Sequence, residues 1–195
     1  MFFKPALTHS ISQKYTLNLS IPVHTTNVQM FCRRQDNFST EEVAKDIIKF
    51  IKDKVISQEY SPPRFNFHFA VTEILGNSYD SYAMKGLVLG QSLLIKVVVT
   101  IKDHKLQIKI KDNGQGFANI PKSNTFEMPS QYQNKKIGLN HGGKQLGLKC
   151  IRYLLDQTGD SMELKNRKNE GAAVYLEFDL KPAWKFPGVT LMSKL

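Results

Sequence analysis

Cysteine, tryptophan and long apolar runs are scarce in this sequence of 195 residues. The two cysteines, Cys32 and Cys150, lie too far apart to suggest a disulfide framework or a cluster of metal ligands. No apolar run approaches the roughly 18 residues that a membrane-spanning helix needs. The first residues also lack the charged-then-apolar order of a secretory signal. These absences favour a reducing, cytoplasmic setting and no membrane partner.

Acidic residues are few beside the basic ones. The chain has 17 Asp and Glu against 27 Lys and Arg, which gives a formal net charge of +10. Such an excess favours an anionic partner. The lysines are scattered, however, and no recognition-helix or zinc-finger pattern accompanies them. Nucleic acid is therefore a less favoured partner than an acidic protein surface or an anionic ligand.

The chain does have the apolar content of a packed domain. Its hydrophobic fraction is 41%, with 12 Phe and 7 Tyr, which argues against disorder. Residues 15–181 form the expected domain, between an N-terminal arm at 1–14 and a C-terminal tail at 182–195. The order of periodic segments predicts an α+β fold, a two-layer sandwich with helices on one face of a sheet.

Local patterns place the expected elements along the chain. Apolar residues alternate at 15–21 and again at 28–32, which suggests a hairpin. A capping box at 39–42 opens a helix that runs to about Ser57. The remaining expected elements are a helix from after Pro63 to Lys85, adjacent antiparallel strands at 93–101 and 106–111, a helix at 146–155, and strands at 162–165 and 173–180.

A polar stripe crosses the helix that ends near Lys85. Glu73, Asn77 and Asp80 share one helical face and are flanked by apolar neighbours. The stripe is either a polar face towards water or a ligand-facing surface beside the core. Buried carboxylates and amides need partners, because burying them without any is costly.

Two glycine motifs bear on that choice. The first, 112–116 (DNGQG), follows a strand and is either a common turn or a place where a flat ligand approaches the backbone. The second, 142–148 (GGKQLGL), opens a helix and is either a flexible connection or a phosphate site at the helix N-terminus. The stretch between them is long for a loop in a compact chain, which is typical of a functional lid or of a disordered segment.

Two known nucleotide-binding motifs are excluded. Residues 138–144 (GLNHGGK) are close to a Walker phosphate loop, but Gln145 stands where Ser or Thr should bind magnesium, and no apolar strand precedes. A Rossmann fingerprint would need glycine at Asn119.

Taken in order, ExxxNxxD on a helix, DxGxG after a strand, a long lid and GGxxLGL opening a helix resemble the GHKL ATPase superfamily. This group includes the ATP domains of histidine kinases, heat-shock chaperone ATPases and anti-sigma-factor serine kinases. The resemblance covers about residues 15–180. It implies the Bergerat fold, a mixed and mostly antiparallel sheet with helices on one face, and it implies that ATP and Mg²⁺ bind between helices and lid, at about 113–144.

The resemblance also implies roles for the residues of the first two motifs. Asn77 would be the magnesium ligand, and Glu73 would be the catalytic base that activates water or a hydroxyl. Asp80 would be a lesser contact to the nucleotide. Asp112 would accept a hydrogen bond from the adenine amino group, and Gly114 and Gly116 would shape the adenine pocket.

The second glycine motif would serve the phosphate end. Gly142, Gly143, Leu146 and Gly147 would line it, and Lys144 would contact phosphate. Gln145 departs from the glycine that is usual there, which would stiffen lid closure or weaken the phosphate contact.

These expectations lead to Mg-ATP binding and two competing classes of function. One is an ATPase or protein kinase, closest in layout to the anti-sigma serine kinases, that acts on a protein partner. The other is a nucleotide-gated protein-binding module without turnover. A homodimer is compatible with both classes. A self-contained histidine kinase is not expected, because no helix pair with a phosphoacceptor histidine precedes the domain.

Overall fold

Seven strands and three helices make up the described part of the chain. The structure, a computed structural model, describes residues 12–27, 40–117, 146–168 and 170–183. The elements in chain order are β1 (Gln13–Pro22), α2 (Thr40–Ser57), β2 (Tyr60–Ser61), α3 (Phe67–Lys85), β3 (Ser92–Lys102), β4 (Lys105–Asp112), α5 (Leu146–Asp156), β5 (Ser161–Asn166), β6 (Ala172–Asp179) and β7 (Lys181–Pro182).

Five of the strands form one sheet in the order β1-β3-β4-β6-β5. All the pairings between its neighbouring strands are antiparallel. Asp103 and His104 join β3 to β4 with φ angles of 50° and 61°. Two successive residues with positive φ match the twist of the strands that a tight hairpin joins. The β3–β4 hairpin expected from the sequence is therefore confirmed.

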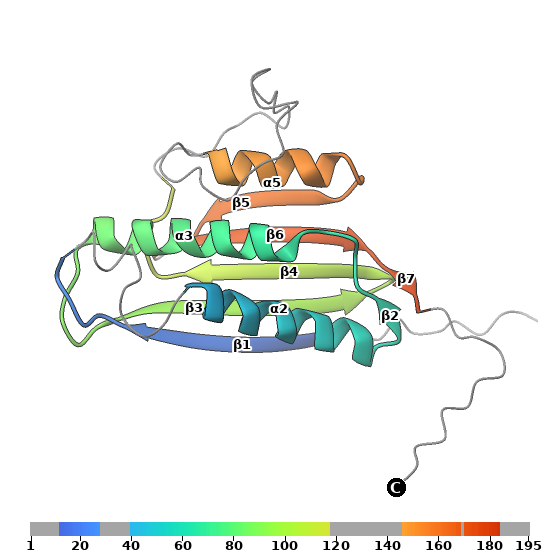
Figure 1. The fold of residues 1–195 in the computed structure, drawn as a ribbon, viewed down its shortest axis with the longest axis horizontal. Coiled ribbons are helices and arrows are strands. Elements are labelled where there is room, and N and C mark those ends of the chain that lie inside the picture. Colours follow the sequence, from blue (N-terminus) through green and yellow to red (C-terminus); the bar gives the residue numbers. More distant parts are fainter. Residues whose placement is uncertain (1–11, 28–39, 118–145, 169, 184–195) are drawn as a thin grey trace, which may run out of the picture.

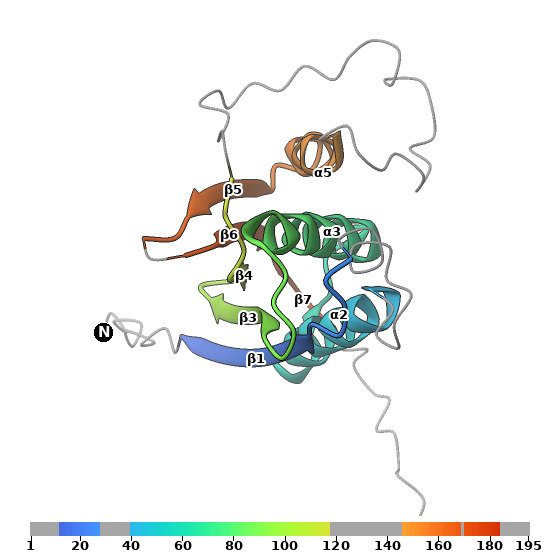
Figure 2. The ribbon, with the colours of Figure 1, turned by 90° about the vertical axis from the view of Figure 1, so that its left-hand side faces the viewer.

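All three helices cover the same face of this sheet (Figure 1). The view along the strands in Figure 2 shows α2, α3 and α5 on one side and none of the described helices on the other. Alternate strand residues point into the layer between sheet and helices, where Leu106, Ile108 and Phe178 are almost fully buried. This arrangement confirms the two-layer α+β sandwich.

Helix α3 lies at the centre of the helical layer. Its N-terminus is capped by the Asn66 side chain, which accepts a hydrogen bond of 3.1 Å from the Phe69 amide. It ends at Gly86, where φ is 105°, a value that glycine adopts without strain. Ten of its 19 residues are buried, including Ile74, Leu75 and Tyr79. A helix buried over so much of its surface is a rigid support for polar residues on its remaining face.

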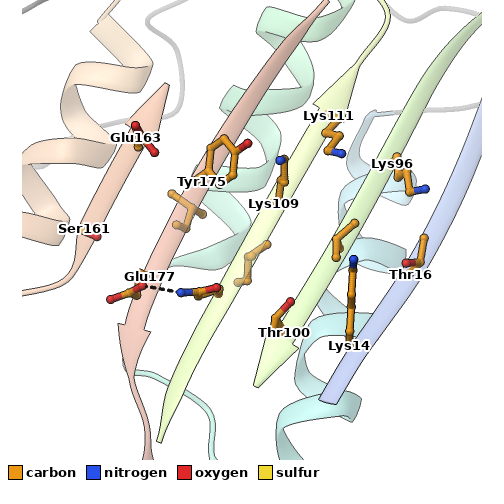
Figure 3. Close-up of a pocket in the computed structure, with 14 residues that line it drawn as sticks. Lys14, Thr16, Lys96, Thr100, Lys109, Lys111, Ser161, Glu163, Tyr175 and Glu177 are labelled. Atoms are coloured by element: carbon orange, nitrogen blue, oxygen red, sulfur yellow. Dashed lines mark hydrogen bonds between the residues drawn. The ribbon is translucent and has the colours of Figure 1, made fainter. Parts of the chain in front are cut away.

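The opposite face of the sheet is lined largely by polar and charged side chains, among them four lysines (Figure 3). Alternation explains the difference, since successive strand residues point to opposite faces. Along β4, Leu106, Ile108 and Ile110 are buried, whereas Lys105 and Gln107, which alternate with them, are exposed.

Two strand pairings of the fold were not predicted from the sequence patterns. The strand at 15–21 pairs along its whole length with β3, whereas its expected hairpin partner at 28–32 lies outside the described residues. A two-stranded sheet also joins β2 to β7, next to the expected domain end. None of the described helices is both long enough and apolar enough to cross a bilayer.

Candidate nucleotide-binding site

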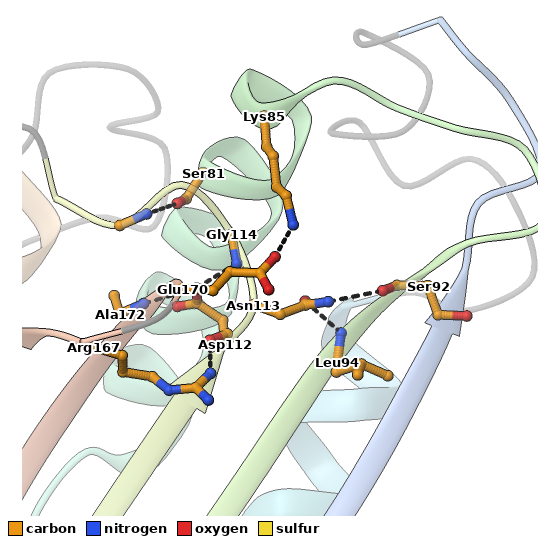
Figure 4. A network of polar contacts seen from close by, with 11 residues as sticks. Ser81, Lys85, Ser92, Leu94, Asp112, Asn113, Gly114, Arg167, Glu170 and Ala172 are labelled. Atoms are coloured by element: carbon orange, nitrogen blue, oxygen red, sulfur yellow. Dashed lines mark hydrogen bonds and ion pairs between the residues drawn. The ribbon is translucent and has the colours of Figure 1, made fainter.

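The turn that follows β4 lies against α3, and Asp112 is at the centre of the polar contacts between them (Figure 4). Asp112 ends β4 and is 6% exposed. Its Oδ1 accepts from the backbone N–H groups of Gly114 (2.9 Å) and Ala172 (3.1 Å). Its Oδ2 accepts from the Ser78 hydroxyl at 3.2 Å. One carboxylate thus joins α3, the turn after β4 and the start of β6.

These three hydrogen bonds leave Asp112 with acceptor capacity. An ionised carboxylate offers about four lone-pair positions, and Oδ2 takes a bond only from Ser78 among the described residues. Burial raises the pKa of Asp112, and the backbone bonds from Gly114 and Ala172 oppose that rise. A buried acceptor with one vacant position suits a neutral N–H donor, such as the exocyclic amine of adenine.

Close packing fixes the turn beside this carboxylate. A Cβ on Gly114 would lie 2.9 Å from the Ser81 Cβ, so only glycine lets the turn meet α3. The Ser81 hydroxyl then accepts from the Gly116 amide at 3.0 Å. At Gly171, φ is 75° and a Cβ would overlap the Asp112 carbonyl. The glycines of this region are needed for close approach between backbone segments.

The rim of the turn is held by charged and amide side chains. Arg167 donates to the Asp112 carbonyl at 2.6 Å. Lys85, at the end of α3, forms an ion pair with Glu170 in the β5–β6 connection. Asn113 accepts from the Leu94 amide and donates to a backbone carbonyl of β3, at 2.8 and 3.1 Å. Both flanks of the Asp112 turn are therefore fixed to neighbouring elements.

The polar stripe of α3 continues away from Asp112. Asn77 is half-buried, and its amide nitrogen donates to the Glu73 carbonyl at 2.7 Å. That bond directs the amide oxygen of Asn77 away from the helix backbone. An amide oxygen is a ligand that a hard cation such as Mg²⁺ accepts.

The side chain of Glu73, on α3, lies against the first turn of α5. A Cβ on Gly147 would overlap the Glu73 carboxylate, so the two groups are in direct contact. The first turn of a helix presents unpaired N–H groups and the positive end of the dipole, which favours anions. Burial, and secondarily the charge of Glu73, raise the pKa of the nearby Cys150 thiol. Glu73 of the α3 stripe and Gly147 of the second glycine motif therefore meet in space.

The structure does not bring every predicted residue into this group. Asp80 is solvent-exposed on α3. Gly142, Gly143, Lys144 and Gln145 lie outside the described residues, as does the side chain of Leu146, although Leu146 begins α5. Gly116 is placed in the turn with φ of 92°, beside the Asn166 side chain.

Sequence reasoning missed three contributors. Ser78 and Ser81 are the α3 residues that contact the Asp112 turn, whereas the stripe predicted from spacing stressed Asp80. Small polar residues at i and i+3 on an otherwise buried helix were the available signal. Arg167 gave no such signal, because its position depends on the β5–β6 connection.

Comparison with known families shows to which family the chain belongs. The family model of histidine kinase-, DNA gyrase B- and HSP90-like ATPases matches residues 65–182, which include α3, the Asp112 turn and α5. The chain belongs to this GHKL family. The resemblance seen in the motifs is thereby confirmed, and membership in the GHKL family implies ATP binding.

Curated relatives point to the histidine kinase branch of the GHKL family. Proteins named as NtrY-like sensor histidine kinases are 24% identical in Rickettsia conorii and 23% in Rickettsia prowazekii, over 141 residues. These matches cover 68% of this chain but only 22% of each relative's length. A similar solved structure is the nucleotide-free catalytic domain of histidine kinase ThkA, with 16% identity, 74% of this chain and 96% of that chain covered, and a TM-score of 0.41. The curated relatives favour a histidine kinase over an anti-sigma serine kinase. The expected anti-sigma layout is not confirmed.

Proposed function

We propose that the chain binds Mg-ATP between α3, the Asp112 turn and α5, and that it catalyses phosphoryl transfer to a protein or hydrolysis of ATP. The observation that carries the proposal is the buried Asp112 carboxylate, which is held by three donors and keeps one acceptor position. The proposed domain is residues 15–181, with an arm at 1–14, a lid at about 113–144 and a tail from 182.

The described residues fit adenine. Asp112 offers an acceptor for the exocyclic amine in a buried setting, where a missing partner would be costly. Gly114 and Gly116 shape the same turn, because Ser81 leaves no room for a side chain at Gly114. We assign these three residues to the adenine end.

The residues also fit the phosphate end and its magnesium ion. Magnesium commonly binds through one or two protein groups and the phosphates of the nucleotide. Consistent with this, the described residues hold no cluster of three or more His, Cys, Asp or Glu side chains that could bind a metal alone. We assign the Asn77 amide oxygen to the ion, where magnesium would supply charge neutralisation at the phosphates.

Phosphate oxygens would meet the N-terminus of α5. Gly147 is in the first turn of that helix and in contact with Glu73. We assign Gly142, Gly143, Lys144 and Leu146 to the same end on the motif alone. Asp80 is proposed as a lesser contact, since it shares a helical face with Glu73 and Asn77.

Glu73 is proposed as the general base. Its carboxylate lies beside the helix N-terminus, where the phosphate chain would end. There it could accept a proton from a water molecule or from an acceptor hydroxyl while the phosphoryl group transfers. The protein's own contribution is otherwise positioning and electrostatics, as in other phosphoryl transfers.

The acceptor would belong to a protein partner. The relatives named as histidine kinases favour a histidine acceptor, and the layout of the motifs is similar to serine kinases. Phosphohistidine is labile in acid, whereas phosphoserine is stable, so the two acceptors can be told apart after transfer.

A turnover assay tests the catalytic part of this proposal. Purified protein with γ-labelled Mg-ATP is expected to release phosphate or to label a partner, and Glu73→Gln should lose that turnover while it keeps ATP affinity. Binding without release or transfer by the unmodified protein would instead favour the nucleotide-gated binding module, for which the Gln145 departure provides a reason.

A further inference from the structure

The helix-free face of the sheet contains a hollow of about 430 Å³ (Figure 3). Side chains from all five strands line it, from Lys14 on β1 to Ser161 on β5. The helical layer lies on the other face of the same strands, and Asp112 is buried in register with the inward-facing residues of β4. The hollow is therefore separate from the nucleotide site.

Lysines gather along this hollow from strands that are far apart in sequence. Lys96 on β3 is the direct cross-strand partner of Lys111 on β4. Lys109 precedes Lys111 by two residues and therefore lies on the same face. Lys14 adds a fourth ammonium group from β1. Like charges opposite one another destabilise a sheet, so this arrangement costs stability that a bound anion would recover.

Lys111 lies among other positive charges. Burial and then the positive charges of Lys109, Arg167 and Lys96 lower the pKa of Lys111. Within the part of the chain that the structure describes, no ion pair involves Lys96, Lys109 or Lys111. The positive charge of the hollow is available to a ligand.

The carboxylates of the hollow are already neutralised. Glu163 pairs with Lys165 at 2.8 Å. Glu177 accepts from Lys105 at 2.9 Å and from Gln107 at 2.8 Å, and these bonds lower its pKa. Neither carboxylate needs the four lysines for charge balance.

An aromatic ring lies among the lysines. Tyr175 on β6 has the Lys109 ammonium 4.1 Å from its ring centroid and the Lys165 ammonium 5.1 Å from it. These cation–π contacts hold charged groups close to a flat apolar surface. Phosphate-binding and base-stacking groups are thus side by side.

We propose that this lysine–tyrosine face binds single-stranded nucleic acid, with phosphates on Lys14, Lys96, Lys109 and Lys111 and one base against Tyr175. Single-strand binders combine a basic groove with aromatic side chains in this manner. A duplex is less suited, because its major groove is read by a helix or a two-stranded ribbon that enters it.

An acidic peptide fits the face less well. Peptides that join a sheet gain affinity from main-chain hydrogen bonds at its edge. Here most of the residues that line the hollow come from the interior strands β3, β4 and β6, whose backbone groups are paired in the ladders on both sides. A peptide would be limited to side-chain contacts and would leave Tyr175 without a stacking partner.

The experiment is fluorescence anisotropy of the full chain with a labelled 12-nucleotide oligothymidine. The unmodified protein should bind with a log–log salt slope of magnitude about 3, as expected for four phosphate contacts. Lys96→Gln combined with Lys111→Gln should weaken binding at least tenfold, and should reduce the slope by about half. Tyr175→Leu should weaken binding about fivefold to tenfold and leave the slope unchanged.

The matched control is Lys49→Gln combined with Lys52→Gln, which removes the same charge from the exposed side of α2. It should change affinity by less than twofold. An equal loss in this control would show that only net charge matters, and absence of saturable binding at about 50 mM salt would also overturn the proposal. Tighter binding of a polyglutamate peptide of equal charge would replace nucleic acid by an acidic protein partner. ATP affinity, measured on the same variants, tests the nucleotide site separately.

Discussion

At the scale of single residues, the proposed ATP site depends most on Asp112. A carboxylate that is 6% exposed would be costly to bury without partners, and it has three donors from three different parts of the chain. The same contacts orient its remaining acceptor position. The residue therefore has a structural role and a proposed ligand-binding role at once, and substitutions must separate them.

Asp112→Asn should change how stability depends on pH. The pKa of Asp112 is raised in the folded protein, chiefly by burial, so the folded state holds the proton more tightly than the unfolded state. Its contribution to stability is then fully present below the ordinary aspartate pKa of about 4 and is lost as the pH rises through the higher folded value.

The measurement is urea unfolding of both proteins between about pH 4 and 7. The free energy of unfolding of the unmodified protein should fall relative to that of Asp112→Asn as the pH rises, because asparagine does not titrate. A difference that stays constant, or one that grows in favour of aspartate, would contradict the raised pKa.

Glu73→Gln tests the residue proposed as base. Glutamine keeps the size of the side chain beside Gly147 but cannot accept a proton. Loss of a general base commonly costs 10²–10⁴-fold in rate, so turnover of ATP should fall by about that factor while its dissociation constant changes little. Unchanged turnover would remove Glu73 from the chemistry.

The sequence located the main site residues but not their support. Asp112, Gly114, Asn77 and Glu73 were predicted from motif order, and the structure places them in one region, while their nucleotide contacts remain proposals. Ser78 and Ser81 were missed, because local spacing does not show which side of a helix meets a distant turn. Asp80 was assigned a lesser nucleotide contact from its spacing and from the family resemblance, and it is exposed.

At the scale of elements, the connection before β6 is as constrained as the Asp112 turn itself. Gly171 has φ of 75°, and a Cβ there would overlap the Asp112 carbonyl. Gly159, after α5, has nearly the same φ of 76° but open space around it. A side chain at Gly159 would meet backbone strain alone, whereas a side chain at Gly171 would meet backbone strain and steric overlap.

Gly171→Ala should therefore cost much more stability than Gly159→Ala. A left-handed backbone conformation costs a non-glycine residue about 1–2 kcal/mol, which is the loss expected at Gly159. At Gly171 the added overlap must also displace the β4 end, so we expect a loss of about 3 kcal/mol or more. Urea unfolding measures both, and equal losses would show that the connection adjusts freely.

The elements differ in how well local signals predict them. The helix end at Gly86 and the β3–β4 turn at Asp103–His104 were predictable, because caps and turns depend on neighbouring residues. The partner of β1 was not, since alternation at 15–21 predicts a strand without predicting its neighbour. The short β2–β7 pairing was missed for the same reason, because it joins segments over 100 positions apart.

At the scale of the whole molecule, the two faces of the sheet divide the proposed roles. The helical face holds the proposed nucleotide site, and the helix-free face concentrates positive charge that is scattered in the sequence. Composition indicated an anionic partner but could not show where the lysines gather, because cross-strand register decides that. An acidic protein partner, a homodimer and a cytoplasmic location remain predictions.

The central claim is that Asp112 forms the adenine end of a Mg-ATP site, and calorimetry of ATP binding tests it most directly. The unmodified chain should bind ATP more tightly with magnesium than without it. Asp112→Asn should lose about 1.5–3 kcal/mol of binding free energy, because an amide replaces the vacant acceptor with a donor. Asp46→Asn, an exposed position on α2, is the matched control and should lose none. Absence of binding at millimolar ATP, or equal affinity in Asp112→Asn, would contradict the account.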